Sequence, residues 1–209
     1  MQRALILLIP IVAACTTDNG STPPDTRILV VGNDMGPRVQ NITLSRGTSA
    51  VTNALVTVNG IALTETASGH YAGTLPTSLA VGDTIQVDVF AGADSVTGIA
   101  RVPTVPSLTT PGNRAVIHIP TPLDFTWLDT SDPDAFRAGI QHDGVAEVAS
   151  YTGAARSGIV VTSRIPPTAT SVSAFLYAFA EGTFTGSAHP DSRMHVRQSG
   201  GTVTLVIGP

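Results

Sequence analysis

The sequence predicts an all-β protein made of two tandem β-sandwiches, and two patterns carry that prediction. From residue 26 onward apolar side chains recur mainly at every second position, as over 84–89 and 202–207. Such alternation is typical of strands with one buried face. Turn-forming pairs, among them Asn59-Gly60 and Gly200-Gly201, separate these runs at strand-like intervals. No segment carries the 3.6-residue apolar period of a helix beyond one turn.

The composition agrees with strands and turns and excludes several kinds of protein. Charged residues make up 12% of the chain, roughly half the usual share of about 25%, while glycine and proline number 20 and 15. The net charge is −4 and no basic cluster occurs, which excludes nucleic-acid binding and electrostatic docking to anionic lipid. The single cysteine excludes an internal disulfide framework and a cysteine-rich zinc site.

That cysteine, Cys15, ends a short secretion signal. Arg3 supplies a positive start, and the apolar run from Ala4 to Val12 is shorter than the ~20 residues that a membrane-spanning helix needs. The tetrapeptide from Val12 to Cys15, Val-Ala-Ala-Cys, resembles the bacterial lipobox. The resemblance implies that the leader 1–14 is removed, that the Cys15 thiol is lipidated, and that the chain is anchored to a membrane of the cell envelope. An ordinary signal peptide with an incidental cysteine is the alternative.

The residues after the cysteine have the character of a tether. Segment 15–25 is polar, ends in prolines and lacks apolar periodicity, so it is expected to be a flexible spacer of up to about 30 Å. Thr16 stands where an aspartate would, by analogy with enterobacterial lipoproteins, favour the inner membrane. Its identity therefore favours the outer membrane.

A proline-rich linker over 106–111 separates the predicted domains, 26–105 and 112–209. The first contains an Asn59-Gly60 turn, the strand Gly69-His-Tyr-Ala-Gly73, and a Gly82-Asp83 turn into an alternating run. It resembles bacterial immunoglobulin-like or carboxypeptidase-regulatory-like modules, which implies a β-sandwich and no particular activity.

The second domain resembles fibronectin type III modules, more loosely. Leu123-Asp-Phe-Thr-Trp127 matches that family's second strand with its core tryptophan, and Phe136–Ile140 matches the third. Ile165-Pro-Pro-Thr168 matches the proline-containing approach to the sixth strand. The stretch 181–193 is longer than the last hairpin loop usual in that family, so the topology stays open.

One predicted strand, 172–179, is apolar on both faces. Phe175, Tyr177 and Phe179 point one way, and the alternate residues point the other. We expect the aromatic face to enter the core, because large rings fill the ~10 Å gap between sheets. The other face is then covered by a loop such as 181–193, by the other domain or by a partner, and an exposed apolar strip there would mark a binding surface.

Acidic residues cluster in one predicted loop. Asp129, Asp132 and Asp134, with Asp124 nearby, could offer the oxygen ligands that calcium prefers. The spacing is not that of an EF-hand, and Asp132-Pro133 is also typical of a solvated β-turn. The sequence therefore leaves a calcium site at Asp129, Asp132 and Asp134 and a plain turn as alternatives, and predicts no other cofactor.

His189, Asp191 and His195 form the one combination with transition-metal ligand types. Arg193 and Arg197 flank His195 and would repel a cation, so ordinary surface polarity is the competing interpretation. No nucleophile elbow, phosphate loop, dinucleotide fingerprint or zinc-protease motif occurs, and no catalytic residue is predicted.

These patterns together predict a lipid-anchored lipoprotein of the cell envelope, on the periplasmic or the surface face. Its expected role is non-enzymatic, either binding or structural. Two alternatives remain open: a calcium-dependent module that binds a small ligand or glycan, and an accessory subunit of an envelope complex.

Overall fold

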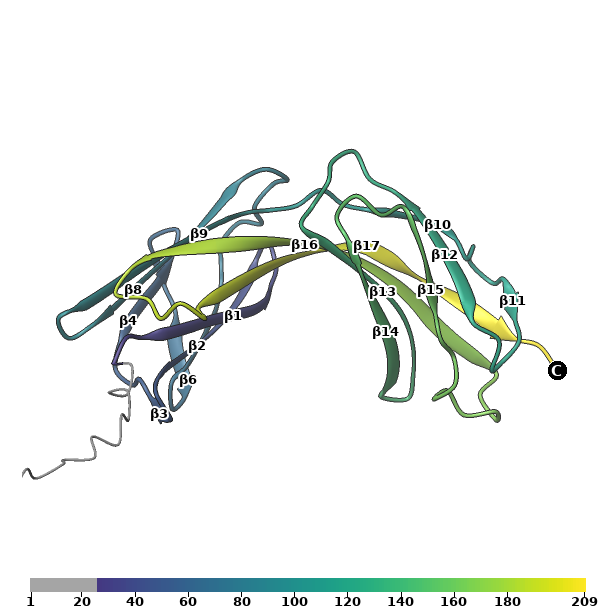
Figure 1. Ribbon diagram of the computed structural model, residues 1–209, viewed down its shortest axis with the longest axis horizontal. Helices are drawn as coiled ribbons and strands as arrows, with labels where there is room; N and C mark the ends of the chain where they lie inside the picture. The colour runs from purple at the N-terminus through teal and green to yellow at the C-terminus, as the bar shows by residue number, and fades with distance from the viewer. Residues whose placement is uncertain (1–25) are drawn as a thin grey trace, which may run out of the picture.

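The computed structural model describes residues 26–209, and every regular element in that range is a β-strand, which confirms the all-β prediction. Figure 1 shows two lobes joined by one long hairpin. Within these residues no helix has the length and apolar character needed to cross a membrane.

The first lobe is a sandwich of two sheets built mainly from nine strands. These are β1 (Leu29–Met35), β2 (Val39–Arg46), β3 (Ser49–Ala50), β4 (Leu55–Val58), β5 (Ile61–Ala62), β6 (Thr64–Ala67), β7 (His70–Thr74), β8 (Thr84–Ala91) and β9 (Asp94–Arg101). One sheet has the order β5–β4–β8–β9 and the other the order β1–β2–β7–β6. Their inward residues alternate along each strand and form one apolar core, in which the β8 residues Ile85, Val87 and Val89 are buried.

The second lobe adds six strands and a second, separate core. They are β10 (Ser107–Thr110), β11 (Val116–Ile117), β12 (Leu123–Leu128), β13 (Ala135–His142), β14 (Val145–Thr152) and β15 (Ser157–Val160). The sheet β10–β12–β15 contributes Phe125, Trp127 and Val160 to the core, and β13 contributes Phe136, Ala138 and Ile140. The sandwich architecture expected for this part of the chain is therefore present.

The last two strands belong to both lobes. β16 (Ser171–Gly186) and β17 (Arg193–Ile207) pair with each other along most of their length. In the second lobe β16 pairs with β13, and β17 pairs with β11. In the first lobe, which holds the turn of the hairpin, β16 pairs with β9 and β17 pairs with β1. Figure 1 shows these two strands running without a break from one lobe into the other.

The hairpin tip, residues 182–196, is thus part of the first lobe although it lies far beyond the predicted linker at 106–111. Met194 and Val196 are buried in the first core, and Leu205, on the same strand, is buried in the second. The tip supplies one strand to each sheet of the first sandwich. The expectation that 181–193 forms a covering loop is wrong for its first part, because residues up to Gly186 extend β16.

A glycine fixes the tip against β9. Gly98 pairs with Phe184, and a Cβ built on Gly98 would come within 2.4 Å of the Phe184 ring. The aromatic ring therefore occupies the space that a side chain at position 98 would take, a known way of stabilising glycine in strands. The absence of a Cβ at Gly98 is what allows the hairpin tip to close onto the first lobe.

The structure reverses the expected orientation of strand 172–179. Val172, Ala174, Leu176 and Ala178 enter the second core, and the aromatic face lies on the outside of the sheet. The reason is volume, because Trp127, Phe125 and Phe136 already fill the space between the sheets. Mostly small side chains from β16 fit against these rings, and larger ones would overpack the core.

The pair Gly200-Gly201, predicted as a turn, lies inside β17. The pairing of β17 with β16 shifts register there, since Thr202 faces Phe175 and Ser199 faces Tyr177. Gly201 has a φ of +90°, which glycine adopts at little cost. The pair is therefore a β-bulge, and it brings residues of opposite parity in β17 onto the same outer face.

Two partly buried tyrosine hydroxyls that form hydrogen bonds within the lobes give an expected pH dependence. Tyr71 Oη accepts a hydrogen bond from Ala54 N and donates one to Val51 O, both 3.0 Å long, and Tyr151 donates to Ile159 O at 2.6 Å. Burial raises the pKa of both phenols. Unfolded tyrosines ionise near pH 10, so this contribution to stability is complete below about pH 10 and is lost as the pH rises through the folded-state values.

We therefore expect the free energy of unfolding to fall steeply above about pH 10, as measured by urea denaturation at a series of pH values. Replacing both residues in a Tyr71→Phe, Tyr151→Phe variant should flatten that fall. An equally steep decline in the double variant would show that other groups cause it.

Candidate functional site

The acidic loop between β12 and β13 is held by contacts within the protein. Asp129 accepts hydrogen bonds from Ser131 N at 3.0 Å and from the Thr104 hydroxyl. Asp132 Oδ1 pairs with Arg156 at 2.5 Å, and Asp134 Oδ2 accepts from Glu181 N at 2.6 Å. The three carboxylates thus turn to three different partners.

No calcium cage results from this arrangement. In the range 26–209 no three His, Cys, Asp or Glu side chains come together in a way that could hold a metal ion. Asp129 Oδ2 is enclosed and has no hydrogen-bond partner among these residues, but calcium takes six to eight oxygen ligands. Asp124, on β12, is exposed and lies apart from the loop, beside Ile159 of β15.

The structure also separates the residues of the predicted histidine set, His189, Asp191 and His195. His189 Nδ1 lies 3.6 Å from Asp191 Oδ2 and accepts a hydrogen bond from Asp191 N at 3.1 Å. His195 Nε2 instead lies 3.9 Å from Glu181 Oε1 on the neighbouring strand. The structure brings His189 and Asp191 together and leaves His195 with a different carboxylate.

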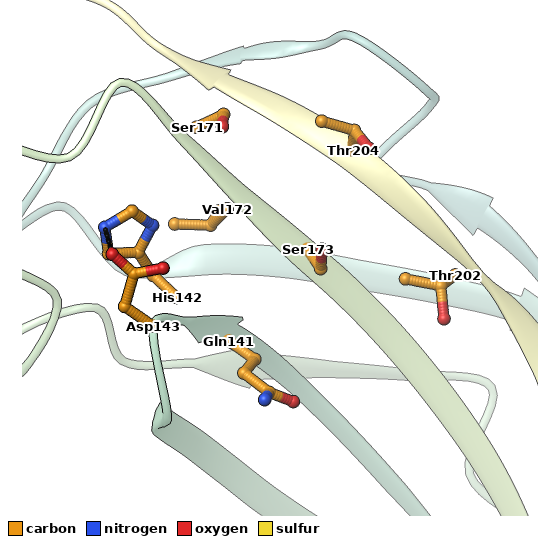
Figure 2. Close-up of a pocket in the computed structure, with 8 residues that line it drawn as sticks. All are labelled: Gln141, His142, Asp143, Ser171, Val172, Ser173, Thr202 and Thr204. Carbon is orange, nitrogen blue, oxygen red and sulfur yellow. Dashed lines mark ion pairs between the residues drawn. The ribbon is translucent and has the colours of Figure 1, made fainter.

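A different surface gathers polar side chains: the outer face of the sheet β14–β13–β16–β17. At one end of it Gln141, Ser173 and Thr204 stand in a single row across β13, β16 and β17. With Thr202 they line an open hollow of about 470 Å³, which we call the polar hollow. Figure 2 shows these hydroxyl and amide groups coming from three adjacent strands.

The rim of the polar hollow carries one ion pair. His142 Nε2 lies 3.3 Å from Asp143 Oδ2 at the turn between β13 and β14, and Figure 2 shows the two side chains together beside Val172. Asp143 has a φ of 45° and Gly144 one of 82°, as a tight two-residue hairpin requires. The turn thus places an imidazole and a carboxylate next to a surface of neutral hydroxyl and amide groups.

Farther along the same face, aromatic rings and arginines replace the hydroxyls. Phe175 and Tyr177 have ring centroids 5.2 Å apart, and Tyr177 and Phe179 have centroids 6.4 Å apart. The Arg137 guanidinium lies 4.5 Å above the Phe179 ring, and that of Arg197 lies 4.7 Å above Tyr177. Such cation–π stacking holds both guanidinium groups in place.

These rings and arginines, with Val148, line a smaller hollow of about 170 Å³, which we call the arginine hollow. The nearest row on β16 toward the tip places Glu181 opposite His195, and these two lie near each other. The guanidinium groups of Arg137 and Arg197 form no ion pair and no hydrogen bond with any residue in the part of the chain that the structure describes. Their donors are therefore available to a ligand.

A third hollow, of about 300 Å³, lies at the junction of the lobes. Its lining comes from both sides, with Val81 and Arg101 from the first lobe and Pro133 from the second. Asp132 and Asp134 also line it, but their carboxylates are engaged as described above. This hollow is therefore a contact between the two lobes, and its two carboxylates already have partners.

The outer-face residues were not among the sites predicted from sequence. The signal for them was present in the doubly apolar strand 172–179, where a second face was expected to need a cover or a partner. Arg137 and Arg197 could not be brought together from the sequence, because they meet only through the pairing of β13 and β17 with β16.

Comparison with known proteins leaves the chain without a family. No family model and no curated protein matches its sequence. Among solved structures, the fibronectin(III)-like modules of Clostridium thermocellum CbhA align with 86% of this chain and 93% of their own length, at 13% sequence identity and a TM-score of 0.28. Such a likeness carries no argument about function.

Proposed function

We propose that this protein is a lipid-anchored lipoprotein of the bacterial cell envelope, sited at the outer membrane, with a non-enzymatic binding or structural role. The observation that carries the proposal is the Val-Ala-Ala-Cys sequence ending at Cys15, directly behind a short apolar leader. Cys15 and the segment 1–25 lie outside the described residues. Lipid on a cysteine that becomes the new N-terminus would carry more than one acyl chain, as stable anchoring requires.

The described part of the chain is compatible with that role. The first strand begins at Leu29, a few residues after the proline-ended tether, so the fold starts where the spacer would end. The unbroken β16 and β17 make the two lobes one continuous body. A tethered body of this kind would present its outer faces at a set distance from the membrane.

We also propose that the first lobe is immunoglobulin-like or carboxypeptidase-regulatory-like and the second fibronectin type III-like. For the second lobe the support is its layout, with β10–β12–β15 facing β14–β13–β16–β17 and Trp127 in the middle strand of the smaller sheet. For the first lobe it is the sandwich itself, with turns at Asn59-Gly60 and Gly82-Asp83 beside the strands.

Lipidation gives the direct test of the anchor. In bacteria expressing the full chain and fed a palmitate analogue, wild-type protein should carry the label and fractionate with the outer membrane. The Cys15→Ala variant should lose both properties, because no other thiol exists in the chain. A Thr16→Ala variant, changed one residue farther on, should behave as wild type. Label that persists on Cys15→Ala would exclude the anchor.

A further inference from the structure

We infer that the outer face of the β14–β13–β16–β17 sheet binds an acidic oligosaccharide, whose carboxylates are held by Arg137 and Arg197 and whose hydroxyls meet the polar hollow. This goes beyond the proposed anchoring and does not depend on Cys15. The inference rests on the free guanidinium groups, on their fixed positions and on the type of surface beside them.

The two arginines are held in a crossed arrangement. Arg137 is paired in register with Tyr177 but stacks on Phe179, while Arg197 is paired with Phe179 but stacks on Tyr177. Each side chain therefore leans diagonally over the central strand, a reach that long side chains have in sheets. A guanidinium group that stacks on a ring through its flat face keeps its N–H edges for a ligand.

These edges match a carboxylate. Guanidinium groups bind carboxylates through two parallel hydrogen bonds, and such charge-assisted bonds are stronger than neutral ones. Arg137 and Arg197 therefore place two positive charges, neither with a carboxylate partner among residues 26–209, on the two sides of the same strand, β16. Charge complementarity therefore selects an anionic ligand for the arginine hollow.

The polar side chains on the rest of this outer face indicate which class of anion would bind. From Phe179 to Ser173 the outward positions of β16 cover about 20 Å, and they end in the row of Gln141, Ser173 and Thr204. Hydroxyl and amide groups both donate and accept hydrogen bonds, as the hydroxyls of a sugar do. An elongated ligand with many hydroxyls and some carboxylates, such as a chain of uronic acids, fits both ends.

An acidic peptide fits this face less well. Extended peptides usually bind to sheets by adding a strand to a free edge. β13 is paired on both sides, with β14 and β16, and β16 is paired with β13 and β17, so the two central strands of the face offer no edge. A peptide lying across these strands would have to rely on side chains alone.

The β17 bulge makes the combined site possible. Thr202 and Thr204 lie on one side of the Gly200-Gly201 step and Arg197 on the other, yet all three face outward because the register shifts there. The bulge is covered from below by the linker, since a Cβ on Gly200 would come within 2.3 Å of Pro106 O. Without it, Arg197 would point into the core and the two hollows would not share one face.

The test is calorimetric titration of the purified full chain, in detergent, with oligogalacturonate. A neutral galactose oligomer of the same length and a polyglutamate peptide of matching charge serve as comparison ligands. We expect wild type to bind oligogalacturonate at least about tenfold more tightly than either, and the binding to weaken as salt is raised.

The matched variants are Arg137→Gln, Arg197→Gln and, as control, Arg101→Gln, which removes the same charge from an exposed position on the first lobe. Each outer-face variant should weaken binding by about tenfold or more, while Arg101→Gln leaves it unchanged. A melting temperature close to that of wild type shows that each variant is folded.

Three outcomes would overturn the inference. The first is no binding of oligogalacturonate by wild type, and the second is undiminished binding by Arg137→Gln and Arg197→Gln. The third is equal binding of polyglutamate in competition with the sugar, which would make the ligand an acidic peptide. None of these results affects the Cys15 labelling experiment, so failure here and failure of the anchor proposal can be told apart.

Discussion

Deleting the hairpin tip is expected to unfold the first lobe and leave the second lobe folded. In this variant residues 180–196 are replaced by a two-residue Asn-Gly turn that joins the paired residues Phe179 and Arg197, so that β16 and β17 end within the second lobe. The first lobe then loses two strands, the pairing to β9 and β1, and the buried side chains of Met194 and Val196. A sandwich without a strand in each sheet exposes apolar surface on both, and a domain this small has little stability to spare.

Hydrogen exchange measured by mass spectrometry separates the two lobes. Amides in β2 and β8 should lose protection in the deletion variant, while those in β12 and β13 should keep it. The single tryptophan, Trp127, lies in the second core, so its fluorescence should still show a cooperative unfolding transition. A fragment of residues 26–105 should likewise fail to fold, and a well-folded fragment would contradict this account.

A milder change tests the same contact. Met194 is 1% exposed, and Met194→Ala should lower the free energy of unfolding of the first lobe by about 2–5 kcal/mol. Val206, on the same strand but 41% exposed, serves as the matched control, and Val206→Ala should change stability by less than about 0.5 kcal/mol.

The strands and their two cores were predictable from sequence because they depend on local pattern. The alternation in 84–89 and 123–127 places Ile85, Val87 and Trp127 inward, as the structure has them. Burying one face of a strand is a requirement that every sandwich shares, whatever its topology. Period-two runs therefore identify core residues even where the pairing of strands is unknown.

The sharing of the hairpin could not be predicted, because it depends on contacts between distant segments. Gly182 and Gly186 weaken the strand signal beyond residue 180, and they reach the first lobe only through pairing with β9, about 85 residues earlier. The orientation of 172–179 was equally hidden, since either face of that strand is apolar. Only the volume already taken by Trp127 and its neighbours decides which face enters the core.

The candidate sites also depend on contacts between distant segments, which local sequence does not reveal. Sequence proximity grouped Asp129, Asp132 and Asp134, but tertiary partners such as Arg156 and Glu181 take their carboxylates separately. Conversely, Arg137 and Arg197 are 60 residues apart in the chain and meet only across β16. A site formed by neighbouring strands can be recognised once the register of their pairing is known. The register of β17 against β16 depends on the Gly200-Gly201 bulge.

Replacing Trp127 with alanine is expected to lower the free energy of unfolding of the second lobe by about 3–5 kcal/mol. Trp127 is 1% exposed and lies between two rings, with centroids 5.3 Å from Phe136 and 5.4 Å from Tyr151. Tyr151 in turn lies over Gly158, where a Cβ would come within 2.1 Å of its ring. Removing the indole leaves a cavity that these fixed rings cannot close, and urea denaturation followed by far-ultraviolet circular dichroism measures the loss.

Two further variants show whether packing is the cause. Trp127 Nε1 has no hydrogen-bond partner among residues 26–209, so Trp127→Phe loses volume but no hydrogen bond and should cost well under half as much. Leu128, the next residue, points to the other face of β12 and is 66% exposed, so Leu128→Ala should be nearly neutral. If Leu128→Ala proved as costly as Trp127→Ala, the assignment of the inner face of β12 would be wrong, and with it the reason that β16 turns its aromatic rings outward.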